Sequence, residues 1–170
     1  MVFAGFVAGC GLREPALVNP GMSTANRFAA GPSTSSQDGG APADTRVDLQ
    51  SVQPVGKAFV SRGHFDGRWT AQIAVNEAAL ATYTNLAASS RFGVGSVLVK
   101  KHASTASATP GPIFVMTKRD PSFYPEGGDW EYVVLDAGGH LQDGGKLALC
   151  ARCHAEANAD WVFGLPAEAR

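Results

Sequence analysis

The residues with the clearest capacity for chemistry lie near the end of the chain, in the run Cys150-Ala151-Arg152-Cys153-His154. This C-x-x-C-H spacing is the sequence motif for covalent attachment of a c-type haem. Two thiols three residues apart on a helical turn point the same way, so each can add to one vinyl group of the same haem. His154 would then lie under the iron as its axial ligand. The motif therefore predicts covalently attached haem c, with the iron bound by His154.

Closely spaced cysteines also occur in structural zinc sites and in redox-active dithiols. Structural zinc requires further ligands with a spacing of their own, and the chain has no second cysteine pair and no pair of histidines at that spacing. A thioredoxin-like dithiol lies at a strand-to-helix turn of a βαβ unit, whereas this pair follows a glycine-rich segment near the C-terminus. Haem attachment is the interpretation that the motif and its context favour.

Composition divides the chain into a tail and one domain. With 170 residues and a formal net charge of -1, the chain can bury a sizeable core, and no basic excess points to nucleic acid. Residues 12–44 are mostly Gly, Pro, Ser, Thr, Ala and Asn without any period, a composition that cannot offset its ordering entropy. We therefore expect a signal remnant at residues 1–10, a disordered tether at 11–45 and a haem domain at 46–170.

The third cysteine, Cys10, has no partner for a disulfide once the other two are assigned to haem. The run Phe6-Val7-Ala8-Gly9-Cys10 ends a short apolar stretch with small residues and resembles a bacterial lipobox. By that resemblance the chain would be cut before Cys10, lipidated there and held at a membrane facing the periplasm. Haem attachment to C-x-x-C-H is also extracytoplasmic, so the two signals agree. The alternative is an apolar N-terminus without function.

The elements expected between residues 46 and 163 are mostly strands. Alternating apolar residues from Trp69 to Val75 predict a half-buried strand, and Asn76 is expected to cap a helix that starts at Glu77. Further strands are expected at 97–99, 113–118 and 130–135, with a long loop at 102–111, a turn at 136–139 and a haem-bearing helix that runs to about 163. The fold class is therefore α+β, a mainly antiparallel sheet with a few helices and the haem on a C-terminal helix.

Four segments, in this order, together resemble the cytochrome P-460 family. They are Phe92-x-x-Gly95-Ser96-Val97-Leu98-Val99-Lys100, Met116-x-Lys118-Arg119, Gly128-Asp129-Trp130-Glu131-Tyr132, and the haem motif followed by Asp160-x-Val162-Phe163. The resemblance implies a mostly antiparallel β domain, usually dimeric, with a high-spin haem whose distal face is open. In the founding members that haem oxidises hydroxylamine, and a lysine forms an extra covalent bond to the porphyrin. The related cytochromes c-prime-beta lack that bond and bind nitric oxide.

The resemblance assigns a role to Lys100, and the positions of three other charged residues suggest roles for them. Lys100 falls on the position of the cross-linking lysine, although it could instead point into water, as most lysines do. Arg119 and Glu131 flank a loop rich in proline and glycine, and they could form a proton relay or simply pair at the surface. Glu156, two residues after the expected axial histidine, is expected to be a charge on the face of the helix, and the alternative is a carboxylate that moves protons near the haem.

A six-coordinate haem would need a second axial ligand, and the available side chains are His64, His102, His140 and Met116. His102 and His140 lie in polar, loop-like contexts and are expected to be solvated, whereas Met116 lies in an apolar strand and is expected in the core. We therefore expect an open distal site. An apolar distal wall could come from five aromatic residues that any core would also use, namely Phe65, Trp69, Phe92, Phe114 and Tyr132.

These observations lead to one functional expectation and its alternatives. We expect a periplasm-facing haem protein that binds hydroxylamine or nitric oxide at an open iron position and transfers electrons to a soluble redox partner. A nitric-oxide-binding module without turnover, a six-coordinate electron carrier and a structural domain without haem remain open. The partners expected are a small nitrogen ligand, a membrane reached only through a lipid anchor, and a second copy in a homodimer, with no nucleic acid.

Overall fold

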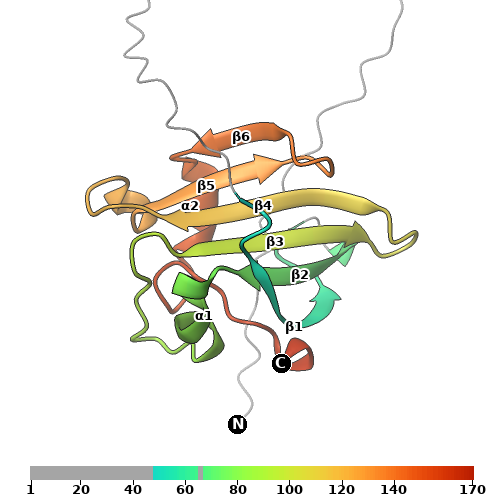
Figure 1. Ribbon diagram of the computed structural model, residues 1–170, viewed down its shortest axis with the longest axis horizontal. Helices are drawn as coiled ribbons and strands as arrows, with labels where there is room; N and C mark the ends of the chain where they lie inside the picture. The colour runs from blue at the N-terminus through green and yellow to red at the C-terminus, as the bar shows by residue number, and fades with distance from the viewer. Residues whose placement is uncertain (1–47, 65–66) are drawn as a thin grey trace, which may run out of the picture.

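The computed structural model describes residues 48–64 and 67–170. Six strands form one antiparallel sheet in which each strand pairs with the next one along the chain. They are β1 (Gln53–Val60), β2 (Trp69–Val75), β3 (Val97–Ser104), β4 (Pro110–Lys118), β5 (Trp130–Leu135) and β6 (Leu141–Gly145). Figure 1 shows them stacked in this order from β1 to β6. The lipobox with Cys10, the tether and Phe65 lie outside the described residues.

Two α-helices complete the domain and confirm the predicted α+β class. α1 (Glu77–Thr84) starts where expected, because the side chain of Asn76 accepts a hydrogen bond from the backbone N–H of Ala79 at 3.1 Å. α2 (Ala148–His154) contains the C-x-x-C-H motif. Two short 3-10 turns are also present: η2 (Pro125–Gly127) lies between β4 and β5, and η3 (Ala167–Ala169) lies near the C-terminus. Neither these helices nor any other in the described part has the length and apolar composition needed to cross a membrane.

Several predicted boundaries are wrong. α2 ends at His154 rather than near Phe163, and Asp160 and Trp161 have left-handed backbone conformations, with φ of 49° and 62°, that a right-handed helix does not contain. β3 extends to Ser104 and β4 begins at Pro110, so the connection between them is shorter than the loop expected at 102–111. β1 and β6 were not expected at all.

The two faces of the sheet bury different sets of residues. The face against which α1 and α2 pack, called the helix face below, contributes Val75, Leu98, Met116, Trp130 and Tyr132 to the larger core cluster. The opposite face buries Ala74, Val99, Val115, Val133 and Leu135 beneath Leu49 and Val52. Side chains alternate along a strand, so Lys100 and His102 of β3 share the helix face with Leu98. Lys100 pairs in register with Ile73 of β2 and Phe114 of β4, which lie on the same face.

Candidate haem site

The two thiols of the motif lie on α2, which packs against the helix face. Cys150 is surrounded in the chain by good helix formers, Ala148, Leu149 and Ala151. The helix is held against the sheet because its core-facing side packs into the larger core cluster through Leu147, Cys150 and Ala151. Cys150 and Cys153 are both half-buried and lie about one helical turn apart, so their side chains lie on neighbouring parts of one helix surface. This arrangement suits two thioether bonds to a single haem.

His154 is held in the state that an iron ligand requires. Its Nδ1 lies 2.8 Å from the carbonyl oxygen of Trp161. A carbonyl oxygen only accepts hydrogen bonds, so Nδ1 carries the proton and Nε2 carries the lone pair. Burial lowers the pKa of His154, which favours the neutral imidazole. The rings of Tyr132 and Phe163 contact the imidazole edge-on, each with its centroid 5.5 Å away.

The carbonyl of Trp161 belongs to a left-handed turn that is anchored by Asp160. The carboxylate of Asp160 accepts hydrogen bonds from Lys118 Nζ at 2.8 and 2.9 Å and from the backbone N–H of Phe92 at 2.9 Å. The backbone carbonyl of Asp160 accepts a bond of 2.8 Å from Trp130 Nε1. We call these four residues the Asp160 network. The segments that resemble the family contain all four residues, but no spacing or period in the chain connects them.

A second group of titratable side chains lies on the helix face, formed by His64, Lys100 and His102 around Phe114. The ring of His64 lies 4.4 Å from that of Phe114 and 5.5 Å from that of His102, measured between centroids. Burial lowers the pKa of Lys100 to about 8, although the charge of the nearby Cys153 acts in the opposite direction. Lys100 is therefore half-buried beside the motif rather than directed into water, and its Nζ lies 5.6 Å from the centre of the Phe59 ring.

His102 is buried, so the expectation that it would be solvated is wrong. It lies within β3, and its Nδ1 donates to the carbonyl oxygen of Pro112 at 2.9 Å. Burial lowers the pKa of His102 to about 4. The alternation of β3 could have revealed this position, because His102 stands two residues from Lys100 and four from Leu98. His140 is exposed and Met116 is buried in the core, so both of those predictions are confirmed.

His64 contains a buried polar atom that the described residues do not satisfy. Its Nδ1 is inaccessible to solvent and has no hydrogen-bond partner within residues 48–64 and 67–170. Burial, together with the charges of Lys100, His102 and His154, lowers the pKa of His64 to about 2. A buried imidazole with an unused nitrogen is what a bound ligand would complete.

The other expected site residues lie apart from His154. Arg119 Nε and Glu131 Oε2 pair with each other at 3.1 Å, and Glu131 alternates with Trp130 and Tyr132, which places it on the face opposite the helix face. Glu156 is exposed beyond the end of α2, so its expected place on a helix is wrong.

The expected aromatic wall does not form one group. Phe114 and Tyr132 lie beside the imidazoles described above. Phe92 instead packs edge-on against Trp130, with ring centroids 5.4 Å apart. Trp69 covers Gly111, where an added Cβ would lie 2.2 Å from the indole ring. Phe114 therefore lies beside the group of His64, Lys100 and His102, and Tyr132 lies beside the motif's histidine.

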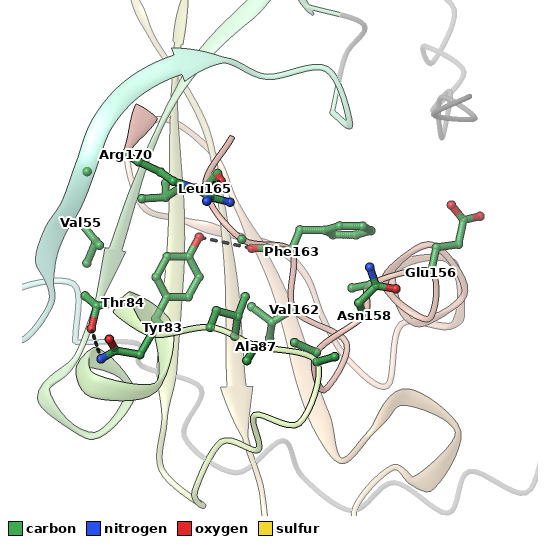
Figure 2. Close-up of a pocket in the computed structure, with 17 residues that line it drawn as sticks. Val55, Tyr83, Thr84, Ala87, Glu156, Asn158, Val162, Phe163, Leu165 and Arg170 are labelled. Carbon is green, nitrogen blue, oxygen red and sulfur yellow. Dashed lines mark hydrogen bonds between the residues drawn. The ribbon is translucent and has the colours of Figure 1, made fainter. Parts of the chain in front are cut away.

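A cavity of about 690 Å³, which the sequence did not suggest, lies between the end of α1 and the segment that follows the motif. Figure 2 shows Tyr83, Val162, Phe163 and Leu165 around it, with the Tyr83 hydroxyl directed at the backbone of Phe163. That hydroxyl donates to the carbonyl oxygen of Phe163 at 3.3 Å. Phe163 also contacts His154, so this cavity borders the segment that packs against the motif's histidine.

Taken together, these residues fit a covalently held haem. The donor set is two half-buried thiols on one helix and a neutral imidazole whose Nε2 is available to a metal. The unsatisfied Nδ1 of His64 is a further polar atom for which a group outside the chain could provide a partner.

Comparison with known proteins agrees with this geometry. The model of the family described as Cytochrome P460 matches residues 57–164, a range that contains β2 to β6, both helices, the Asp160 network and the group of His64, Lys100 and His102. No curated protein sequence matches the chain.

Proposed function

This chain belongs to the cytochrome P460 family and is therefore a haem protein, and on that premise we propose that it binds hydroxylamine or nitric oxide at an open iron position and oxidises it. The proposal includes covalent attachment of the haem through Cys150 and Cys153, with His154 as the axial ligand. When bound, the haem supplies a Lewis acid and a redox centre. Electrons would leave to a soluble redox partner.

The observation that carries this proposal is the half-buried position of Lys100 beside the motif. Lysine is seldom buried without a partner or a task, because removing its charge from water is costly. Lys100 lies on the helix face next to Cys153, and its pKa of about 8 leaves more neutral amine than an ordinary lysine has. A neutral amine is the nucleophilic form. We propose that Lys100 forms the additional bond to the porphyrin by which the hydroxylamine-oxidising members of the family are distinguished. The amine nitrogen would replace a hydrogen of the porphyrin, a step that releases two protons and passes two electrons to an external oxidant such as a peroxide.

The remaining residues of the helix face take supporting roles in the proposal. His64 would donate a hydrogen bond to the bound nitrogen species or accept a proton from it, because its Nδ1 is buried and unused among the described residues. Phe114 and Tyr132 would limit the access of water. Arg119 and Glu131 lie on the opposite face and are not part of this mechanism.

The experiment that tests the proposal combines spectroscopy with mass analysis. The protein is expressed with a c-type maturation system, and absorption spectra are recorded for the ferric and dithionite-reduced forms. We expect a high-spin spectrum, a strongly red-shifted Soret band on reduction, hydroxylamine oxidation, and a proteolytic peptide in which haem joins Lys100 to the two cysteines. Lys100→Met should lose the third bond and the red shift, whereas Lys101→Met, which changes the exposed neighbour, should keep both.

Two other outcomes correspond to other functions. A high-spin spectrum that responds to nitric oxide but shows no turnover and no third bond would indicate a binding module. A low-spin spectrum would indicate a six-coordinate electron carrier. One observation favours this second candidate: the buried Nδ1 of His64 has no hydrogen-bond partner among the described residues, which leaves it available as a second axial ligand. Absence of covalent haem would refute the whole proposal.

We also propose that the protein is anchored on the periplasmic side of a bacterial membrane through lipid at Cys10. This rests on the lipobox-like run and on the extracytoplasmic site of haem attachment. Metabolic labelling with a fatty acid should mark the wild-type protein but not Cys10→Ser, and Cys10→Ser should move to the soluble fraction. The proposed homodimer is tested by the mass of the haem-loaded protein in solution.

A further inference from the structure

We propose that Asp160 is a positioning residue for the axial histidine, acting through the backbone carbonyl of Trp161. This inference rests on the proposed function, because it concerns His154 as a ligand of iron. The side chain of Asp160 does not contact His154 itself. Asp160 holds the turn in which the next residue, Trp161, provides the carbonyl oxygen that accepts the hydrogen bond from His154 Nδ1.

The contacts of Asp160 come from three distant parts of the chain. Lys118 reaches it from the end of β4 and Trp130 from the start of β5, while Phe92 contributes a backbone N–H. The side chains of Lys118 and Asp160 are only 14% and 4% exposed, so this ion pair is largely shielded from water. Lys118 Nζ also donates to the carbonyl oxygen of Gly128 at 2.8 Å and lies 5.0 Å from the centre of the Trp130 ring. Asp160 is therefore fixed on both its carboxylate and its backbone carbonyl.

These contacts hold a backbone conformation that is unfavourable on its own. Asp160 and Trp161 both have positive φ, which costs non-glycine residues about 1 kcal/mol or more each. The ring of Trp161 lies directly on Gly128, where an added Cβ would come within 2.5 Å of the indole. The contacts of Asp160 on one side and of the Trp161 ring on the other thus hold the turn that directs the Trp161 carbonyl at His154.

The direction of that carbonyl matters for the chemistry of the ligand. The hydrogen bond to Nδ1 selects the tautomer, fixes the rotation of the ring and increases the electron density on Nε2. If the turn relaxed, the bond would lengthen and the imidazole would become a weaker donor to iron. A network that merely stabilised the core would have no such effect on the iron.

The test uses two variants of different severity and a matched control, all in the haem-loaded protein. Asp160→Asn removes the charge that holds Lys118, and Trp130→Phe removes only the donor to the Asp160 carbonyl while keeping an aromatic ring. The control is Asp136→Asn, since Asp136 also accepts two backbone N–H groups and pairs with a basic side chain, but in the exposed turn after β5. The readouts are the iron–histidine stretching frequency of the ferrous protein, by resonance Raman spectroscopy, and the reduction potential.

We expect both network variants to lower the stretching frequency and make the potential more positive, with Asp136→Asn unchanged. If Asp160→Asn is too unstable to load with haem, Trp130→Phe still decides the question. Folded, haem-loaded variants with the wild-type frequency and potential would overturn this inference and leave the proposed function intact. A wild-type protein without an iron–histidine band would overturn the proposed function and this inference with it.

Discussion

The ion pair between Lys118 and Asp160 should be one of the most sensitive points of the domain. Its two residues are separated by 42 positions, and both side chains are largely buried. Lys118→Met replaces the cation by a neutral side chain of similar length. Among the described residues, the carboxylate of Asp160 then keeps one donor, the N–H of Phe92, and the carbonyl of Gly128 loses the donor that Lys118 provides.

The size of the effect follows from the burial of the carboxylate that remains. Removing one partner of a buried ion pair costs about 3–5 kcal/mol, because the other charge stays desolvated without compensation. We therefore expect the free energy of unfolding to fall by that amount. Urea unfolding of the haem-loaded protein, followed by far-ultraviolet circular dichroism, should show a midpoint lower by about 2 M for a domain of this size. Urea is preferable to guanidinium because it does not screen charges.

Two further variants separate this reason from others. Lys101→Met makes the same substitution at an exposed position of the same sheet and should stay within about 0.5 kcal/mol of the wild type. The double variant Lys118→Met/Asp160→Asn removes the unpaired charge and should be more stable than Lys118→Met alone. A cost below about 1 kcal/mol for Lys118→Met, or a double variant less stable than the single one, would refute this account of the pair.

Three other predictions follow from the site. His64→Phe should raise the carbon–oxygen stretching frequency of the ferrous carbon monoxide complex and weaken azide binding about fivefold, the equivalent of one lost hydrogen bond. His64→Gln should stay close to the wild type in both measurements. An unchanged frequency in His64→Phe would count against a contact between His64 and the bound ligand. Gly128→Ala should destabilise the protein by about 2–3 kcal/mol, because the residue has a positive φ and its new Cβ would meet the ring of Trp161. Gly95→Ala should cost about 1 kcal/mol, because Gly95 also has a positive φ but open space around it. Equal unfolding midpoints for the two variants would contradict the contact with Trp161. The pKa of His102 lies at about 4 in the folded protein, below its ordinary value of 6.5, so its contribution to stability is complete above pH 6.5 and is lost as the pH falls. Between pH 7 and pH 5 that loss should reach about 2 kcal/mol, and His102→Asn should show a correspondingly flatter pH dependence of its urea midpoint.

The local sequence was sufficient to predict the motif, the fold class and the best-patterned elements. The spacing of Cys150, Cys153 and His154 is a property of consecutive residues, and so is the alternation from Trp69 to Val75 that became β2. Asn76 as a helix cap is equally local, since its side chain binds an N–H three residues on. β1 and β6 escaped prediction because they are edge strands whose side chains are mostly exposed, which leaves no buried period to detect.

Only the tertiary structure decided which side chains surround the motif. His102 looked like a solvated loop residue, and it is buried because β3 continues beyond Lys100 with its helix face covered. Arg119 and Glu131 pair as one sequence-based alternative allowed, yet strand alternation places Glu131 on the face away from His154. The Asp160 network joins residues from four separate segments, and no local period relates them. Such contacts depend on strand register and on how the segment after α2 folds back, because long-range burial rather than neighbouring sequence determines both.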